Sequence, residues 1–151
     1  MRRRHKPARF KRVERFTSRS TKGIIKTHSL NPTFPLHISQ ITKQGDLNTA
    51  ELLVNNKAKV NAYSNSKKTA LHLAALYNHH EMIELLLKNK ANIEAKTDEI
   101  CTPLHFAAKK GNLQCVKVLL NHNAKLYQRD FRKWSPLHYA AYNGEETFWV
   151  C

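Results

Sequence analysis

Residues 69–75 read T-A-L-H-L-A-A, and the pattern returns as T-P-L-H-F-A-A at 102–108 and as S-P-L-H-Y-A-A at 135–141. The interval from Thr69 to Thr102 equals that from Thr102 to Ser135. A fixed period of about 33 residues is typical of a chain built from stacked supersecondary units, none of which can bury its apolar face alone. The pattern therefore predicts an elongated array. It also places function on the shared surface of that array rather than in a catalytic pocket.

Other positions follow the same period. Asn78, Gly111 and Gly144 stand at the same place in successive copies, shortly after the Thr or Ser that opens each one. Asn and Gly tolerate the positive φ that a loop between two helices needs. The apolar pattern of residues 82–87 recurs at residues 115–120, one period later. Each copy is thus expected to hold two helices joined by a short loop.

These motifs resemble the ankyrin repeat, a unit of one β-turn and two antiparallel helices with the hallmark T-P-L-H-x-A. The resemblance covers roughly 36–144 and implies an all-α solenoid with β-turn fingers. Leu36 opens the first copy, because that register places Gly45 in the loop between helices. The expected repeats are a degenerate copy at 36–68, full copies at 69–101 and 102–134, and a copy cut short at 135–151.

The chain departs from the family pattern at the finger tips. The family has Gly two positions before the hallmark Thr, and this chain has Lys67, Ile100 and Lys133 there. If the backbone keeps a positive φ at these places, each residue should cost about 1 kcal/mol relative to Gly.

The net charge of +15 is concentrated at the N-terminus. Residues 1–30 hold eleven Lys or Arg and a single acid, Glu14, which leaves a net charge of +10 there. This segment has too few Leu, Ile and Val to offset the entropy of ordering it, so we expect a disordered basic arm. Residues 31–35 contain two prolines and are expected to form an extended linker, which makes 1–35 one arm-and-linker unit.

The basic arm has several interpretations, which its sequence leaves open. It suits a nuclear-import signal, or a tail that binds the phosphates of nucleic acid or acidic lipid. Phe10, Val13 and Phe16 follow a helical spacing that would suit a membrane surface, and plain solubilising disorder is the simplest alternative. The basic residues that carry these interpretations are Arg2, Arg3, Arg4, Lys6, Arg9, Lys11 and Arg12.

Nothing in the sequence predicts an enzyme, a metal site or a cofactor. It has no Gly-rich phosphate loop, no G-x-S-x-G and no H-E-x-x-H motif. His72, His105 and His138 fall in successive units about 10 Å apart, too far to share one zinc ion. We expect each histidine to bond turn backbone and link neighbouring units. His79 and His80 are expected to lie in a solvated loop.

The resemblance implies that a partner protein binds the concave side, formed by the finger tips and the first helices. Tyr77, Phe131, Trp134 and Tyr142, beside three basic residues, have the composition of interface anchors. The alternative is that Trp134 packs on the neighbouring finger, as a Trp before the hallmark commonly does in this family, and Tyr139 is a candidate for the core. The expected partner contacts are Lys68, Leu76, Tyr77, Lys109, Lys110, Phe131, Arg132, Trp134, Tyr142 and Asn143.

The sequence thus favours a non-enzymatic interaction module with a targeting arm. The first alternative is a nuclear factor whose arm contacts nucleic acid, and the second is a piece of a larger ankyrin-bearing scaffold or channel. Scattered cysteines, odd in number, and the lack of an apolar run of about 18 residues suit a cytoplasmic or nuclear protein without a transmembrane segment.

Overall fold

The structure is a computed structural model that describes residues 36–144. The arm and linker expected at 1–35 lie outside the described residues, and so do residues 145–151. The described part consists of seven α-helices: α3 (Leu36–Gln44), α4 (Leu47–Asn55), α5 (Ala70–Leu76), α6 (His80–Lys88), α7 (Pro103–Lys110), α8 (Leu113–Asn121) and α9 (Pro136–Tyr142). The prediction of an all-α repeat solenoid is confirmed.

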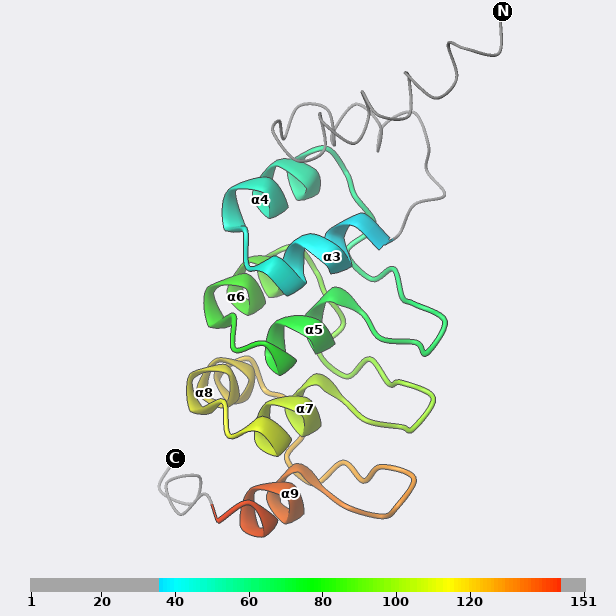
Figure 1. Cartoon of the computed structure of the whole chain (residues 1–151), viewed down its shortest axis with the longest axis vertical. Coiled ribbons are helices and arrows are strands. Elements are labelled where there is room, and N and C mark those ends of the chain that lie inside the picture. Colours follow the sequence, from blue (N-terminus) through cyan, green and yellow to red (C-terminus); the bar gives the residue numbers. More distant parts are fainter. Residues whose placement is uncertain (1–35, 145–151) are drawn as a thin grey trace, which may run out of the picture.

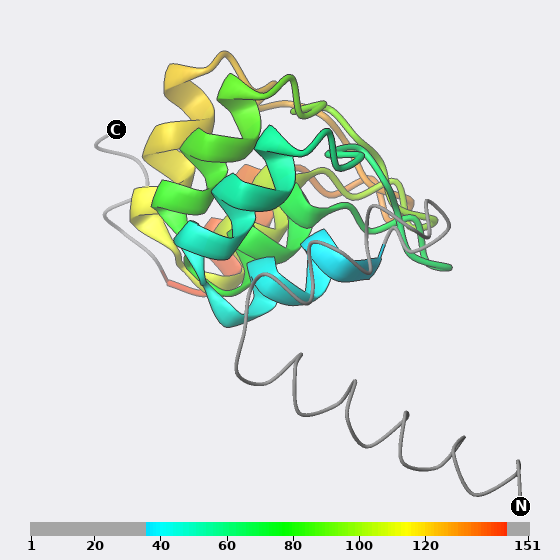
Figure 2. The same cartoon turned by 90° about the horizontal axis from the view of Figure 1, so that it is seen from above.

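The helices form two parallel rows. Helices α3, α5, α7 and α9 stack on one another as an inner row, and α4, α6 and α8 stack behind them as an outer row (Figure 1). The long loops that lead into α5, α7 and α9 project as fingers to one side of both rows (Figure 2). Fingers and inner helices together enclose the concave face of the molecule.

Small and large apolar residues divide the core between the two rows. Ala74, Ala75 and Ala107 are fully buried in the inner row, where their small side chains let neighbouring helices approach closely. Leu86 and Leu119 are also fully buried and belong to the outer helices. The single cluster that they form runs through all the described repeats, so each repeat completes the core of the next.

The fingers are short hairpins with a repeated hydrogen-bond pattern. In the first finger the backbone N–H of Ser64 donates to the carbonyl oxygen of Lys68 at 2.9 Å. Thr97 repeats this bond with Cys101 at 3.1 Å, and Asp130 repeats it with Trp134 at 2.9 Å. Adjacent fingers are also bonded to each other through backbone groups, such as Phe131 N–H to Glu99 oxygen at 3.0 Å. The concave wall is therefore a continuous hydrogen-bonded surface.

A capping box with an unusual member starts each inner helix from α5 onward. Thr69 is the N-cap of α5, and the third helical residue, His72, takes the place of the usual Glu or Gln. The backbone N–H of Thr69 donates to Nδ1 of His72 at 3.1 Å. Because Nδ1 accepts, the proton must be on Nε2, which donates to the carbonyl oxygen of Cys101 at 3.0 Å. His72 thus ties its own helix to the next finger.

His105 repeats this arrangement one unit later. Its Nδ1 accepts from the N–H of Thr102 at 3.1 Å, and its Nε2 lies 3.1 Å from the carbonyl oxygen of Trp134. The expectation that these histidines bond turn backbone and link adjacent units is confirmed for His72 and His105.

The finger tips do adopt positive φ without glycine. Lys67, Ile100 and Lys133 have φ of 55°, 61° and 64°. The left-handed region brings Cβ close to backbone oxygen in an L-residue, so all three tips carry conformational strain.

Gly45 has a φ of 77° and occupies, in the loop of the first helix pair, the place that Asn78 occupies in the second. A Cβ on Gly45 would lie 2.6 Å from Cε1 of His79, so this glycine gives room to that ring. Nε2 of His79 in turn lies 3.3 Å from the carbonyl oxygen of Lys43. The interpretation of His79 and His80 as solvated loop was wrong for His79, which packs between repeats as the N-cap of α6. His80 is exposed, as expected, but it begins that helix rather than lying in a loop.

Candidate functional site

The sequence-predicted residues lie on the concave face but do not form one cluster. They divide among three hollows and one finger tip. Lys68 and Lys109 line the first hollow; Lys109, Lys110, Arg132, Trp134, Tyr142 and Asn143 line the second; Leu76, Tyr77 and Lys110 line the third. Phe131 stands apart at the tip of the last finger, half exposed, with its ring centre 5.2 Å from the guanidinium carbon of Arg132.

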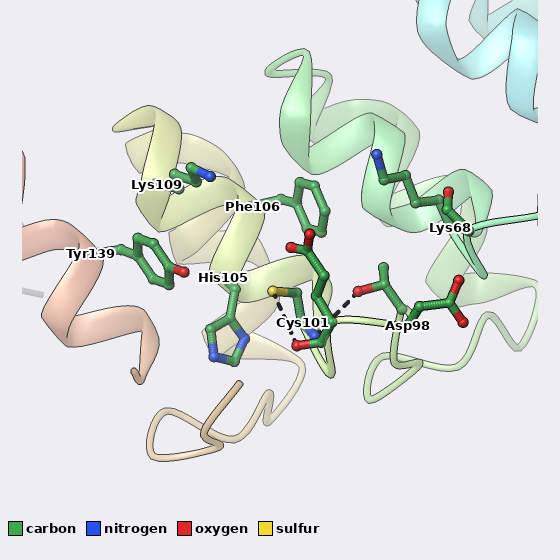
Figure 3. Close-up of a pocket in the computed structure, with 10 residues that line it drawn as sticks. Lys68, Asp98, Cys101, His105, Phe106, Lys109 and Tyr139 are labelled. Carbon is green, nitrogen blue, oxygen red and sulfur yellow. Dashed lines mark hydrogen bonds between the residues drawn. The ribbon is translucent and has the colours of Figure 1, made fainter. Parts of the chain in front are cut away.

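The first hollow is the largest of the three, with a volume of about 450 Å³, and is lined by the first and second fingers and by α7 and α9. Figure 3 shows Lys68 at one end and Lys109 with Tyr139 at the other, with Phe106 between them. The Lys68 ammonium lies 5.7 Å from the centre of the Phe106 ring, within cation–π range. Asp98, Glu99 and Ser66 complete the rim, so this hollow carries charges of both signs.

A buried polar network supports the first hollow. Asp130 is 5 % exposed, and its Oδ1 accepts the backbone N–H groups of Arg132 and Trp134, both at 2.9 Å. Its Oδ2 accepts the hydroxyl of Tyr139 at 2.6 Å and lies 4.0 Å from Sγ of Cys101. The Asp130 carboxylate thereby fixes the third finger, the Tyr139 ring of α9 and the Cys101 side chain in the hollow wall relative to one another.

Two titrating groups in this wall, Cys101 and Tyr139, are kept protonated. Burial, with the nearby Asp130 carboxylate, raises the pKa of the Cys101 thiol to about 11. The same two causes raise the pKa of Tyr139. A thiol acts as a nucleophile only as its thiolate, so Cys101 presents little reactive sulfur at neutral pH.

The second hollow has a volume of about 320 Å³ and is bounded by the end of α7, by α9 and by the third finger. Its aromatic wall is the Trp134 ring, whose centre lies 5.2 Å from that of Tyr139 and 5.7 Å from that of Tyr142. Nδ2 of Asn143 donates to the carbonyl oxygen of Lys109 at 2.5 Å and ties α9 to the end of α7. Since Lys109 and Tyr139 line both hollows, the two adjoin each other.

The third hollow is shallower and lies next to the second along the inner helices, sharing Lys110 with it. Tyr77 is 41 % exposed there, and the Lys43 ammonium lies 5.7 Å from the centre of its ring. Asn112 lines the same hollow and donates through Nδ2 to the carbonyl oxygen of Ala75 at 2.7 Å, which closes the end of α5.

Sequence reasoning missed three contributors to this face. Phe106 and His105 line the first hollow without having been expected there, and Asp130 organises its wall. Tyr139, considered for the core, is half-buried and lines the first and second hollows. The sequence did contain a signal for these residues. The residue after the hallmark His is aromatic in two successive copies, Phe106 and Tyr139, and the fingers near them carry lysine or arginine.

Among residues 36–144, no three His, Cys, Asp or Glu side chains are arranged to hold a metal ion. Within the same range, no helix combines the length and the apolar character that crossing a bilayer requires.

The family comparison agrees with the architecture. A family model described as ankyrin repeats in many copies matches residues 38–87, 73–120 and 107–147. No curated protein matches the chain significantly. Ankyrin repeats are generally protein–protein interaction modules and typically non-enzymatic. The matched segments together span most of the chain, and the stacked helix pairs and capped hallmark motifs lie within them: the chain belongs to the ankyrin repeat family.

Proposed function

We propose that this chain is a non-enzymatic interaction module that holds a partner protein in the concave face. The observation that carries the proposal is that the first and second hollows adjoin each other and share Lys109 and Tyr139. Together they form a trough lined by aromatic rings and basic side chains, the types that dominate interface energetics.

The trough is well suited to rigid recognition. Its floor consists of inner helices packed through buried alanines, and its wall is held by the Asp130 network and by finger-to-finger backbone bonds. A surface that is already ordered loses little conformational entropy on binding, which favours affinity. Tyr142 is 78 % exposed, so a partner that covered it would bury apolar area that is now open to water.

Partner capture with matched tyrosine variants tests the proposal. Tyr142→Ala removes a ring from the trough, and Tyr127→Ala removes an equally exposed ring, also 78 %, that does not line any of the hollows described above. We expect capture of the partner from cell extract to be lost with Tyr142→Ala, Lys110→Glu and Trp134→Ala, and retained with Tyr127→Ala. Capture that survives all three trough changes would show that another face binds the partner.

We further propose that residues 1–30 target the module within the cytoplasm or nucleus through their net charge of +10. The second candidate function, contact with nucleic acid, depends on the same charge. Binding to duplex DNA should be measured over a salt series, with and without residues 1–30. Phosphate contacts predict that log K falls by about 0.9 per neutralised phosphate against log salt, and that removal of the arm abolishes binding. No binding at low salt would exclude the nucleic-acid function.

A further inference from the structure

The charged residues of the described part of the chain that line the second hollow are all basic. Lys109, Lys110 and Arg132 line it, all three are exposed, and no acid from residues 36–144 lines it. The ion pair found within the described residues joins Lys67 to Asp98 at 3.4 Å, so none of the three bases is paired with an acid of that part of the chain. Within residues 36–144, the hollow therefore holds positive charge that no acid neutralises, beside an aromatic wall.

The nearby acid of the third finger is already engaged. Asp130 is buried, and its two oxygens accept the N–H groups of Arg132 and Trp134 and the hydroxyl of Tyr139. Its carboxylate thus points into the finger backbone, where it orients Arg132 rather than pairing with the guanidinium.

Simple helix stabilisation explains only part of the cluster. Lys109 and Lys110 lie in the last turn of α7, where basic residues interact favourably with the helix dipole. Arg132 comes from a finger and has no helix end to stabilise. Its guanidinium presents a planar fork of donors that matches a carboxylate.

We propose that the second hollow receives an acidic peptide segment of the partner protein, which is a refinement that rests on the proposed function. An Asp or Glu side chain lies between Lys110 and Arg132, and a neighbouring apolar side chain packs on Trp134 and Tyr142. The 320 Å³ volume lies at the lower end of the range for ligand pockets and is large enough for side chains of an extended peptide.

The adjoining hollow favours a peptide over a nucleic acid. Glu99 lies on the rim of the first hollow, along the trough from the basic cluster, together with Asp98, which is paired with Lys67. A phosphate backbone carries a negative charge at every step and would meet these two acids. A peptide can place its acidic residue in the second hollow and a neutral or basic residue in the first, so it complements both.

Selection from a display library of random dodecapeptides tests this inference on the full chain. Three proteins are compared: wild type, Lys110→Glu with Arg132→Glu, and a control with Lys117→Glu and Lys125→Glu. The control residues are exposed and do not line any of the hollows described above, and the change in net charge is the same. All three proteins keep the basic arm, so any acid preference due to the arm is common to them.

We expect Asp and Glu to be enriched among peptides bound by wild type and control, and this enrichment to be lost with the hollow variant. One selected peptide is then synthesised with its acids and with the matching amides. The amide form should bind wild type about three- to tenfold more weakly, while the hollow variant should bind both forms within about twofold. Circular dichroism confirms that the variants are folded, and Lys110→Gln with Arg132→Gln repeats the comparison without charge reversal.

Three results would overturn the inference. The first is equal acid enrichment in all three proteins, which would assign the preference to the arm. The second is a selected peptide whose binding is lost with Tyr142→Ala but does not change when its acids are replaced by amides. The trough would then bind peptides through apolar contacts alone, and the proposed function would stand. The third is duplex DNA binding that weakens with the hollow variant, which would assign the basic cluster to phosphates. If the selected peptides still bind the Tyr142→Ala and Trp134→Ala variants, that result would instead contradict the proposed function itself.

Discussion

His72 donates from Nε2 to the carbonyl oxygen of Cys101 at 3.0 Å, in the next finger along the chain, while its Nδ1 accepts from the start of its own helix. One fully buried ring thereby satisfies backbone groups of two repeats at once. Because the hallmark histidines join neighbouring repeats in this way, the stability of the array should depend strongly on them.

Replacement of His72 by Ala should lower the free energy of unfolding by about 2–4 kcal/mol, because it leaves two buried backbone groups without partners and removes buried atoms. Urea denaturation measures the change. His138→Ala is the matched control: it has the same bond to its N-cap, Ser135, but is exposed. Its loss should be clearly smaller, and an equal loss would mean that the bond to the next finger contributes little.

Stability should also depend on pH through His72. Burial lowers the pKa of this histidine to about 4, and burial likewise lowers the pKa of His105. In the unfolded chain a histidine titrates near a pKa of about 6.5. Between these values only the unfolded state binds the proton, so stability is complete above about pH 6.5 and falls as the pH drops toward 4.

The loss attributable to His72 over that window should reach about 3 kcal/mol. Urea denaturation at intervals from about pH 7.5 to about 4 measures the slope. A His72→Asn variant, less stable throughout, should show a shallower slope. Identical slopes for the two proteins would contradict the assignment of this dependence to His72.

Glycine at the finger tips should stabilise the protein. Ile100 and Lys133 have positive φ, and Ile100 is 41 % exposed, so its side chain contributes limited packing. Ile100→Gly and Lys133→Gly should each raise the free energy of unfolding by about 0.5–1 kcal/mol, with the strain relieved partly offset by the added freedom of the unfolded chain. Lys96→Gly, in the same loop as Ile100 but without positive φ, should be neutral or destabilising. Thermal unfolding compares the three, and a gain from Lys96→Gly as large as the others would remove the strain explanation.

The two glycines Gly45 and Gly144 allow backbone strain and steric contact to be separated. Their φ values are similar, 77° and 70°, but a Cβ would lie 2.6 Å from His79 at Gly45, whereas at Gly144 it would lie within 4 Å of no atom in the described part of the chain. Gly144→Ala should lower the free energy of unfolding by about 1 kcal/mol because of its positive φ alone. Gly45→Ala should lower it by about 1–3 kcal/mol more, because the Cβ also meets the His79 ring. Thermal unfolding of both variants measures the difference. Equal costs would show that the His79 ring moves aside freely.

Local sequence signals were sufficient for the helices and their caps. The constant repeat period, the Thr or Ser before each inner helix from α5 onward and the Gly or Asn in each inter-helix loop all belong to single units, so their positions can be read directly. The prediction for His79 was wrong because the role of this residue depends on Gly45 in the preceding repeat, and no local pattern reports that contact.

The candidate site was only partly predictable for the same reason. The expected residues do face the concave side, yet Tyr77, Phe131 and Trp134 lie in separate places rather than in one cluster. Phe106 and Asp130 were missed because the first hollow forms between two fingers and two inner helices, which come from different repeats.

The amino-acid sequence by itself determined the ankyrin architecture, since repeat length, capping and apolar spacing are properties of each unit. Only the tertiary structure decided which side chains share a hollow and which bases remain unpaired within the described residues. The physical reason is that each hollow is shaped by side chains of neighbouring units. Their distances depend on how closely the buried alanines let the inner helices stack and on where networks such as that of Asp130 hold the fingers.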